Sequence, residues 1–369
     1  MKSAHPLAVD RDGRLVEHIE TTLTGYLARR RLDAEQVHPC FADAADALTR
    51  FVLEGGKRIR PTFAWWGWRG AGGDPGGTGD PDTVLRAISA LELVQACALV
   101  HDDLMDHSDT RRGNPAVHIE FARRHRRDGW GGPPEDYGAS AAILLGDLAL
   151  AWADDMLHGS GMTEEQHARV RPVWAAMRTE VLGGQFLDAW SQASGDESVE
   201  AAMRVNRFKT AAYTVERPLL LGAALAGAPS ELVEAYRSFG TDIGVAFQLR
   251  DDLLGVFGDP AVTGKPAGDD LREGKRTLLM ALAFEAAHQD GCTSGIDTLT
   301  GALGGRDLDT ATLERAREVL HELGAVAEVE RRIELLTESG LAALATADVA
   351  APADTALTEL AHAATRRRS

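Results

Sequence analysis

The chain has 369 residues, of which 44% are hydrophobic; this is enough for a sizeable folded core and excludes a disordered protein. Its formal net charge of −17 argues against nonspecific nucleic-acid binding, which needs a basic surface. The three cysteines, Cys40, Cys97 and Cys292, show no metal-ligand spacing, so we expect free thiols in a reducing cytoplasm.

Neither a signal peptide nor a membrane span is expected. The first residues, MKSAHPLAVDRDGR, contain no apolar core of the signal-peptide kind. No apolar run reaches the roughly 18 residues of a transmembrane helix. We therefore expect a soluble, cytoplasmic protein.

Apolar residues recur at helical spacing along nearly the whole chain, and no period-two strand pattern of any length is present. Loops are expected at Gly70–Pro81, Arg123–Tyr137 and Gly258–Gly268, where Gly, Pro and Arg gather. The expected helical stretches are Leu15–Leu27, Ala45–Val52, Pro61–Trp66, about Thr83 to the aspartates at 102–106, Ala139–Leu157, Arg171–Trp190, Val199–Tyr213, Glu216–Ala228, Leu232–Asp251 and Leu278–Leu344.

The pattern predicts an all-α fold, and no Pro/Ser-rich linker divides the chain. Two acidic motifs lie in different halves, so a site shared between them requires one domain. We expect that domain to span residues 1–369, with flexible tails at about 1–10 and 350–369.

The stretch Val100–Gly113 reads VHDDLMDHSDTRRG and combines carboxylates with an arginine pair. On a helix, Asp102 and Asp106 lie on one face, about one turn apart. Two carboxylates that close repel each other unless a cation lies between them, and Mg²⁺ takes one or two carboxylates plus substrate phosphates. The planar donor forks of Arg111 and Arg112 suit a phosphate. For this stretch alone, a solvated helix end is the alternative.

A second acidic pair follows an apolar helical run in the other half of the chain. Phe247–Asp259 reads FQLRDDLLGVFGD and carries Asp251 and Asp252. Two such helices facing each other would form a deep apolar pocket with a charged mouth. The recurrence favours one metal and polyphosphate site over two solvated helix ends.

Basic residues gather at three places. Gly55–Pro61 reads GGKRIRP, where the glycines let the backbone approach a phosphate and a helix start favours an anion. The others are Lys209-Thr210 in NRFKTAAY, and Lys265 with Lys275 in GKPAGDDLREGKRT. Taken singly, each is explained most simply as a solvated surface group.

Taken together, these motifs resemble the trans-prenyl diphosphate synthases, also called polyprenyl synthetases, and among them the bacterial geranylgeranyl diphosphate synthases. GGKRIRP, DDLMD with RRG, KT, and FQLRDD with GK and GKRT follow in the family's order from Gly55 to Thr277. The resemblance implies the isoprenoid synthase fold, a single helical bundle around a central active-site cavity, and a homodimer. It also implies a Mg²⁺-dependent prenyltransferase that adds isopentenyl diphosphate head-to-tail to an allylic diphosphate by ionisation, condensation and elimination.

The resemblance also implies roles for individual residues. Three Mg²⁺ ions would be bound by Asp102, Asp106 and Asp251, supported by Asp103 and Asp252. The catalytic set would be Lys209, Thr210 and Gln248, of which Thr210 and Gln248 present oxygen dipoles toward the allylic carbon. No protein base is expected, because the released diphosphate can accept the proton, and His101 and His107 are taken as structural. The allylic diphosphate would be bound by Arg111, Lys209, Thr210, Gln248, Lys265 and Lys275, and isopentenyl diphosphate by Lys57, Arg60, Gln95 and Arg112.

One position departs from the family pattern. Gly255 stands where the second motif often has a third aspartate. Asp259 lies four residues further on and is the candidate replacement, although we do not expect it to be a direct metal ligand.

In the family, bulky residues four and five before the first aspartate stop the growing tail at fifteen carbons. Here these positions are Ala98 and Cys97, both small. By helical geometry Ala98 lies within about 40° of the face of Asp102, and Leu91 within about 20°, roughly 16 Å further down. We therefore expect geranylgeranyl diphosphate or a longer product. Farnesyl diphosphate is the alternative if another helix supplies the floor of the pocket.

Two rival functions fit the motifs less well. A class I terpene cyclase would normally carry an Asn/Ser/Glu metal motif in place of FQLRDD and would lack GGKRIRP. A noncatalytic subunit of a heteromeric synthase usually has damaged aspartate motifs, and both motifs are intact here. The sequence thus predicts an active enzyme whose partners are its two diphosphate substrates and a second copy of itself, with no nucleic acid.

Overall fold

The structure is a computed structural model that describes residues 11–74, 80–259, 267–305 and 308–366. Helices account for nearly all of the regular structure, which confirms the all-α prediction. The strands within the described ranges are β1 Thr110–Arg111 and β2 Asn114–Pro115, paired antiparallel. The helices are α1 Leu15–Val37, α2 Pro39–Leu53, α3 Ile59–Gly70, α4 Pro81–Met105, α5 Val117–Asp128, α6 Pro134–His158, α7 Glu164–Ser194, α8 Val199–Val205, η1 Asn206–Glu216, α9 Arg217–Ala226, α10 Ser230–Phe257, α12 Asp269–Arg272, α13 Leu278–Gln289, α14 Thr293–Ala302, α15 Thr310–Glu322, α16 Ala325–Leu344 and α17 Ala353–Thr365.

Two predicted non-helical segments are wrong. Most of Arg123–Tyr137 is helical, because α5 continues to Asp128 and α6 begins at Pro134. The arginines that indicated a loop extend a helix whose apolar side is buried. The expected tail after residue 350 contains α17, and Leu357 on this helix is fully buried in the core. Residues 1–10, and residues 260–266 of the loop predicted at 258–268, lie outside the described ranges.

Local sequence explains where two site-bearing helices begin. α4 starts at Pro81, and the Asp80 side chain accepts a hydrogen bond from the Asp82 N–H. α7 starts with a capping box, in which Thr163 accepts the Gln166 N–H while the Gln166 side chain accepts the Thr163 N–H. Both caps satisfy N–H groups that would otherwise lack a partner at the helix end farther from the aspartates.

The segment Asn206–Glu216 is a π-helix, where an α-helix had been predicted for Val199–Tyr213. π-Turns are rare and frequently occur at functional sites. The wider turn changes which side chains face α7 and α10, the two helices against which η1 mainly packs. It carries both Lys209 and Thr210.

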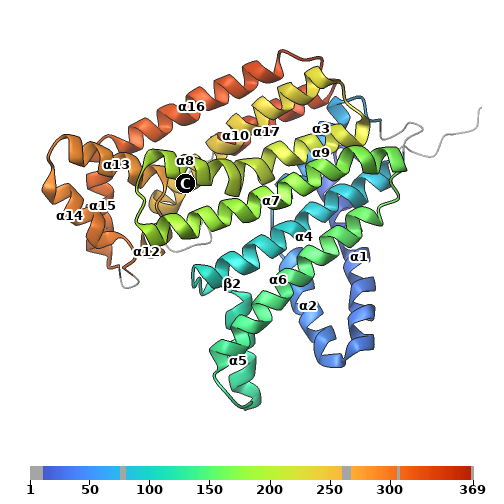
Figure 1. Ribbon diagram of the computed structural model, residues 1–369, viewed down its shortest axis with the longest axis horizontal. Coiled ribbons are helices and arrows are strands. Elements are labelled where there is room, and N and C mark those ends of the chain that lie inside the picture. The colour runs from blue at the N-terminus through green and yellow to red at the C-terminus, as the bar shows by residue number, and fades with distance from the viewer. Residues whose placement is uncertain (1–10, 75–79, 260–266, 306–307, 367–369) are drawn as a thin grey trace, which may run out of the picture.

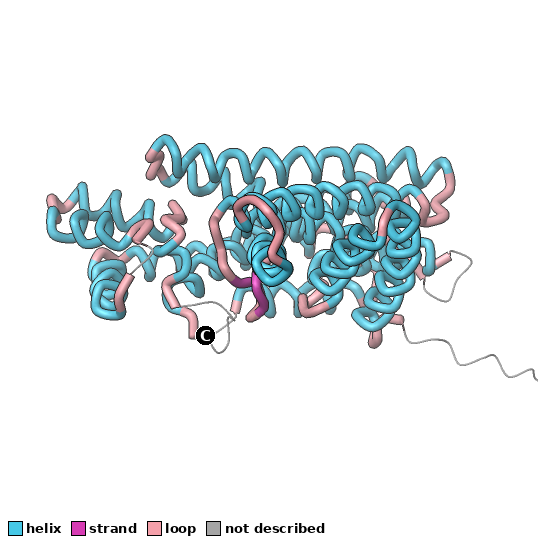
Figure 2. The backbone as a smooth tube through the Cα atoms, turned by 90° about the horizontal axis from the view of Figure 1, so that it is seen from below, coloured by secondary structure: helices cyan, strands magenta, loops and turns pink. Residues whose placement is uncertain are grey.

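The site-bearing helices run side by side through the bundle. α4 lies between α6 and α7, and α10 lies with α16 on the other side of α7 (Figure 1). The short helices α13, α14 and α15 gather at one end, and α1 and α2 lie below α4 (Figure 1). Figure 2 shows the same bundle from below, with the two short strands set among helices.

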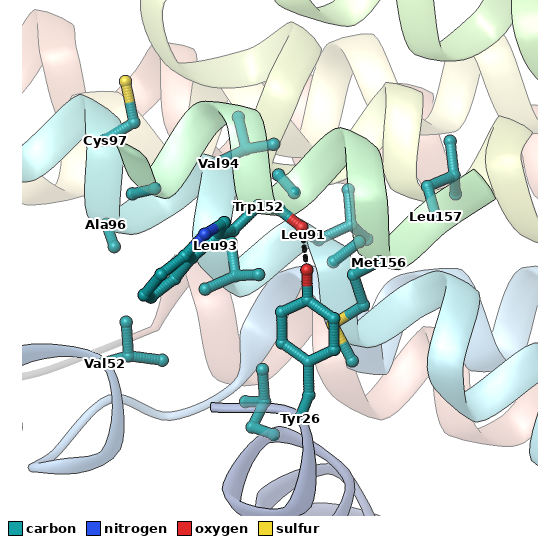
Figure 3. Packing of buried hydrophobic residues seen from close by; sticks show 14 of the residues in the cluster. Tyr26, Val52, Leu91, Leu93, Val94, Ala96, Cys97, Trp152, Met156 and Leu157 are labelled. Atoms are coloured by element: carbon teal, nitrogen blue, oxygen red, sulfur yellow. Dashed lines mark hydrogen bonds between the residues drawn. The ribbon is translucent and has the colours of Figure 1, made fainter. Parts of the chain in front are cut away.

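The core is apolar, and α4 contributes much of it. Leu91 and Leu93 on α4 are fully buried, and Tyr26 of α1 donates a 2.8 Å hydrogen bond to the Trp152 carbonyl of α6 (Figure 3). By length and composition α4 could cross a membrane, with a mean hydropathy of 1.6 over 18 residues. This helix was not predicted as a possible membrane span, because its apolar residues do not form one uninterrupted run in the sequence. Because 78% of that window is buried inside the protein, α4 is accounted for as a core helix.

Candidate functional site

The C-terminal parts of α4 and α10 face one cavity of about 690 Å³, to which α3, α7 and η1 also contribute. Asp102 lines it from α4, and Asp251 and Asp252 line it from α10. The two acidic motifs, far apart in sequence, therefore lie at a single site.

Most of the site residues expected from the sequence lie on the lining of this cavity. Asp106 is buried beside it, with Oδ2 3.5 Å from Lys275 Nζ, and Lys265 lies outside the described residues. The expected residues on the lining are Lys57, Arg60, Gln95, Cys97, Ala98, Asp102, Arg111, Arg112, Lys209, Thr210, Gln248, Asp251, Asp252 and Lys275.

Lys209 of η1 neutralises the first aspartate motif. Its Nζ lies 3.0 Å from Asp102 Oδ1 and 2.5 Å from Asp188 Oδ2 on α7. Burial alone would raise the pKa of Asp102, but Lys209, Lys275 and Arg111 outweigh it and hold that pKa well below its usual range. Burial would likewise lower the pKa of Lys209, but Asp102 and Asp188 hold it above its usual range. Lys209 and Asp102 therefore both remain charged at neutral pH.

The two neighbouring arginines serve different parts of the cavity. Arg111 pairs with Asp103, a fully buried carboxylate, and its guanidinium lies 3.7 Å from Asp102. Asp103 thus orients Arg111 from behind. Arg112 instead donates a 3.1 Å hydrogen bond to the Gly55 carbonyl in the basic turn.

Lys275 lies among the remaining carboxylates. Its Nζ is 2.6 Å from Glu273, 3.6 Å from Asp270 and 3.5 Å from Asp106. Burial would lower the pKa of Lys275, but these carboxylates, with Asp270 and Glu273 first, hold it well above its usual range. One ammonium group does not compensate them all. Burial, followed by repulsion from Asp102, raises the pKa of Asp106 to about 6.

Asp252 is the least compensated of these carboxylates. Gln248 Nε2 donates to its Oδ1 at 2.6 Å, while its buried Oδ2 makes no hydrogen bond. Burial, followed by repulsion from Asp270, raises the pKa of Asp252 to about 8. Asp106 Oδ2 is also buried without a hydrogen bond. Within the described ranges no three His, Cys, Asp or Glu side chains are already grouped as a metal cage. These crowded, buried carboxyl groups are compensated only in part by positive side chains, and this suits the site to divalent cations, which would supply that charge.

The Asp270 side chain lies against Gly255, the position at which the second aspartate motif lacks its third aspartate. A Cβ atom on Gly255 would lie 1.9 Å from Asp270 Oδ2, so a larger residue at position 255 would require that carboxylate to move. Asp259 is exposed and lies off the cavity lining. Asp270 of α12 thus brings a carboxylate to this point, and a role for Asp259 stays a prediction.

The turn GGKRIRP directs its basic residues to opposite sides. Gly55 and Gly56 have φ angles of 82° and 103°, which glycine adopts without strain. The following Arg58 is only 2% exposed, and its guanidinium donates to the buried Glu92 of α4 at 2.8 Å. Arg58 thus anchors the turn inside the protein, while Lys57 stays exposed on the cavity lining.

Tyr213 of η1 links two residues on the other wall of the cavity. The Arg60 guanidinium lies 4.1 Å over the Tyr213 ring and donates to Thr214 Oγ1 at 2.8 Å. The Tyr213 hydroxyl donates to Gln95 Oε1 at 2.5 Å. The π-helix therefore contacts the aspartates Asp102 and Asp188 through Lys209, and the basic turn through the contact of Tyr213 with Arg60.

Sequence reasoning missed Asp188, Asp270, Tyr213 and the Arg58–Glu92 pair. All of them act on partners that only the tertiary fold brings near. For Glu92 a signal was present, because a charged residue inside the apolar run of α4 needs a buried partner.

Comparison with known proteins agrees with this geometry. The Polyprenyl synthetase family profile matches residues 42–316. Geranylfarnesyl diphosphate synthase of Aeropyrum pernix is 34% identical over 298 residues, covering 79% of this chain and 84% of that protein. (2E,6E)-Farnesyl diphosphate synthase of Mycobacterium tuberculosis is 35% identical over 223 residues, covering 60% and 55%. The crystal structure of geranylgeranyl pyrophosphate synthase from Corynebacterium glutamicum, complexed with isoprenyl diphosphate and magnesium, has a TM-score of 0.93 and 48% identity, covering 96% of this chain and 99% of that chain.

Proposed function

Because the chain belongs to the polyprenyl synthetase family and is thus a trans-prenyltransferase, we propose that it condenses isopentenyl diphosphate head-to-tail with an allylic diphosphate. The product proposed is geranylgeranyl diphosphate or longer. The observation that carries the proposal is one cavity lined by both aspartate motifs and by the basic turn. The similar Corynebacterium glutamicum structure was solved with isoprenyl diphosphate and magnesium, ligands that this charge pattern suits.

Asp102, Asp106 and Asp251 are the proposed Mg²⁺ ligands, with three ions expected once a diphosphate is bound. The bound ions would supply positive charge that stabilises the leaving diphosphate. Support comes from the buried Asp106 oxygen without a hydrogen bond and from its raised pKa. Without metal, Lys209 and Lys275 neutralise part of this acidic wall.

Two diphosphate groups would bind in separate parts of the cavity. The basic side chains that line it support this, because they fall into two groups. One group comes from η1 and the loop after α12 and pairs with acidic side chains, and the other comes from the turn before α3. The proposed allylic site comprises Arg111, Lys209, Thr210, Gln248, Lys265 and Lys275, and the isopentenyl site comprises Lys57, Arg60, Gln95 and Arg112.

The side chains of this cavity suit an ionisation mechanism. Breaking the allylic C–O bond leaves a carbocation and a diphosphate, and Lys209 and Arg111 provide fixed positive charge where that negative charge develops. The apolar wall below Asp102 keeps water from the carbocation. Lys57 and Arg60 would position the second substrate so that its double bond faces the allylic carbon. The released diphosphate takes the proton.

The proposed product length rests on α4. Ala98 and Cys97 both line the cavity, and Val94 lines it a further turn down. No bulky side chain on this helix therefore closes the tail pocket directly below Asp102. The similar proteins carry names for both shorter and longer products, so the length must be measured on this chain.

We further propose that the chain acts as a single domain and as a cytoplasmic homodimer. Motifs from both halves line one cavity, which supports a single domain. Free cysteines suit a reducing compartment. α6 and α7 each expose large apolar side chains, which suit burial against a second copy of the chain. We call this set of exposed side chains the apolar patch: Ile143, Leu144, Leu182, Phe186 and Trp190.

The test is incubation of the pure chain with Mg²⁺, isopentenyl diphosphate and each allylic primer, with products identified by mass spectrometry. Linear products of twenty or more carbons are expected. A fifteen-carbon end product would favour a farnesyl diphosphate synthase. A cyclic hydrocarbon formed without isopentenyl diphosphate would favour a terpene cyclase, and no condensation with any primer would contradict the proposed activity.

A further inference from the structure

The far end of the cavity can be located on two helices. Below the first aspartate motif, the lining of α4 includes Ala98 and Val94, whereas Leu91, the next turn down, is fully buried in the core (Figure 3). Glu92 also lines the cavity, but on the side of the basic turn, where it pairs with Arg58. On α7 the lining extends from Asp188 to Arg178, which is about 15 Å along the helix axis. On the side away from the basic turn, the described lining therefore ends at Val94 on α4 and at Arg178 on α7.

Arg178 lies across this end as part of a polar bridge between α7 and α6. Its guanidinium pairs with Asp154 of α6, and Trp174 Nε1 donates to the other Asp154 oxygen at 2.6 Å. Trp174 is only 2% exposed and packs one turn before Arg178, with the guanidinium carbon 5.9 Å from its ring. Of these three residues only Arg178 lines the cavity. Its side chain is 30% exposed and marks the point where the described lining ends on α7.

We propose that Arg178 limits product length by closing the tail end of the cavity with a paired charge. A growing prenyl tail is stabilised by burying its methyl and methylene groups against apolar surface. Further growth past Val94 would require the tail either to desolvate the guanidinium or to separate it from Asp154, and both cost free energy. The inference rests on the proposed function, because it requires a prenyl tail in this cavity.

The experiment compares the products of wild type, Arg178→Leu and Arg178→Met with the same primer and excess isopentenyl diphosphate. Both changes remove the charge, while methionine keeps most of the side-chain length. We expect the main product of each to shift upward by one isoprene unit or more. Asp154 keeps about 35% exposure of its side chain and can be hydrated without its partner, so both variants should fold.

Arg171→Leu is the matched control, because Arg171 is an exposed arginine of α7 off the cavity lining. Its product should equal that of wild type. Adding Ala98→Phe to Arg178→Leu should restore the short product of Ala98→Phe alone, because a ring at position 98 stops the tail before it reaches the end of the cavity.

The outcomes separate this inference from the proposed activity. Absence of condensation by wild type would refute the activity itself. Active, folded Arg178 variants with wild-type product lengths, or with shorter products, would overturn the role of Arg178. A longer product from Arg178→Leu but not from Arg178→Met would show that side-chain volume rather than charge sets the limit, and would also overturn the proposal as stated.

Discussion

Charge compensation is the main lesson of the site at the level of single residues. Lys209 forms an ion pair with Asp102, and Lys275 forms one with Asp106. Burial nevertheless raises the pKa of Asp106 to about 6 and that of Asp252 to about 8, because the nearby positive charges compensate these carboxylates only in part. The sequence identified these aspartates because their spacing is local. It did not identify Asp188 or Asp270, because a carboxylate that reaches the site from another helix leaves no local spacing to detect.

Asp102→Ala should lower turnover by roughly a thousandfold or more, because the proposed metal ions are bound mainly through this carboxylate and its neighbours. Steady-state rates with saturating Mg²⁺ measure this effect, and circular dichroism should show an unchanged fold. Asp136→Ala is the control, since Asp136 of α6 is exposed and lies off the cavity lining. Full wild-type turnover in excess EDTA would refute the metal dependence.

The two diphosphate sites should separate by mutation. Arg60→Ala should mainly weaken binding of isopentenyl diphosphate, and Lys209→Ala mainly binding of the allylic substrate. Each loses a charge-assisted contact, which is worth about 1.5–3 kcal/mol, or about ten- to more than a hundredfold in affinity. The KM of each variant for each substrate measures the split. Equal effects of both changes on both substrates would contradict it.

Individual elements differ in how far sequence could predict them. The long helices were predicted because their apolar spacing is regular, and α4 and α10 carry their aspartates where expected. The π-helix was not predicted, because η1 has an ordinary amphipathic composition and its wide turns are set by packing against α7 and α10. α5 and α17 were missed because arginine- and alanine-rich compositions were taken for a loop and a tail.

Glu92→Gln tests how the basic turn is fixed to α4. Arg58 and Glu92 are 2% and 5% exposed, so the change removes the nearer, buried counter-charge of this guanidinium and leaves only the half-exposed Glu20, 3.5 Å from Arg58 Nε. We expect a loss of roughly 3 kcal/mol in the free energy of unfolding, at the lower end for a broken buried pair because the amide can still accept a hydrogen bond. Urea unfolding measures it. Glu120→Gln breaks the exposed Arg50–Glu120 pair and should cost less than about 1 kcal/mol. Similar losses for both changes would argue against an anchoring role for Arg58.

Ala98→Phe should shorten the product, because a ring there fills the cavity about one turn, roughly 6 Å, below Asp102. Cys97→Phe should do so less strongly, since Cys97 is 4% exposed and its replacement mainly crowds the core, which can cost about 1–3 kcal/mol. Mass spectrometry of products and thermal melting separate the two effects. Ala342→Phe, at an exposed position of α16, is the control. A folded Ala98→Phe enzyme with the wild-type product distribution would show that Ala98 does not face the tail.

For the whole molecule, the sequence indicated the fold class and most of the cavity lining but not the depth of the cavity. Motif order placed the basic turn, the aspartates and Lys209 together, and the structure brings them to one cavity. The end of the tail pocket depends on side chains from α6 and α7, such as Asp154 and Arg178, whose proximity follows from helix packing and not from any spacing in the chain. Leu91, expected from helical geometry to lie below Ala98 in an open pocket, is instead packed in the core.

The same helices α6 and α7 predict the assembly. They flank α4 (Figure 1). Their exposed apolar side chains make up the apolar patch of Ile143, Leu144, Leu182, Phe186 and Trp190. Leaving such a patch in water is unfavourable, and a twofold contact between two copies would bury it twice. Sedimentation analysis should therefore find a dimer at micromolar concentration.

Leu144→Asp places a charge in this patch, where Leu144 is 66% exposed, and should shift the sedimenting species toward monomer because the carboxylate would lose its hydration at the contact. Leu32→Asp is the matched control, since Leu32 of α1 is 57% exposed and lies away from the patch. It should leave the dimer intact. A dimer that survives Leu144→Asp but dissociates with Leu32→Asp would place the contact on α1, and a wild-type monomer at all concentrations would remove the second copy from the proposal.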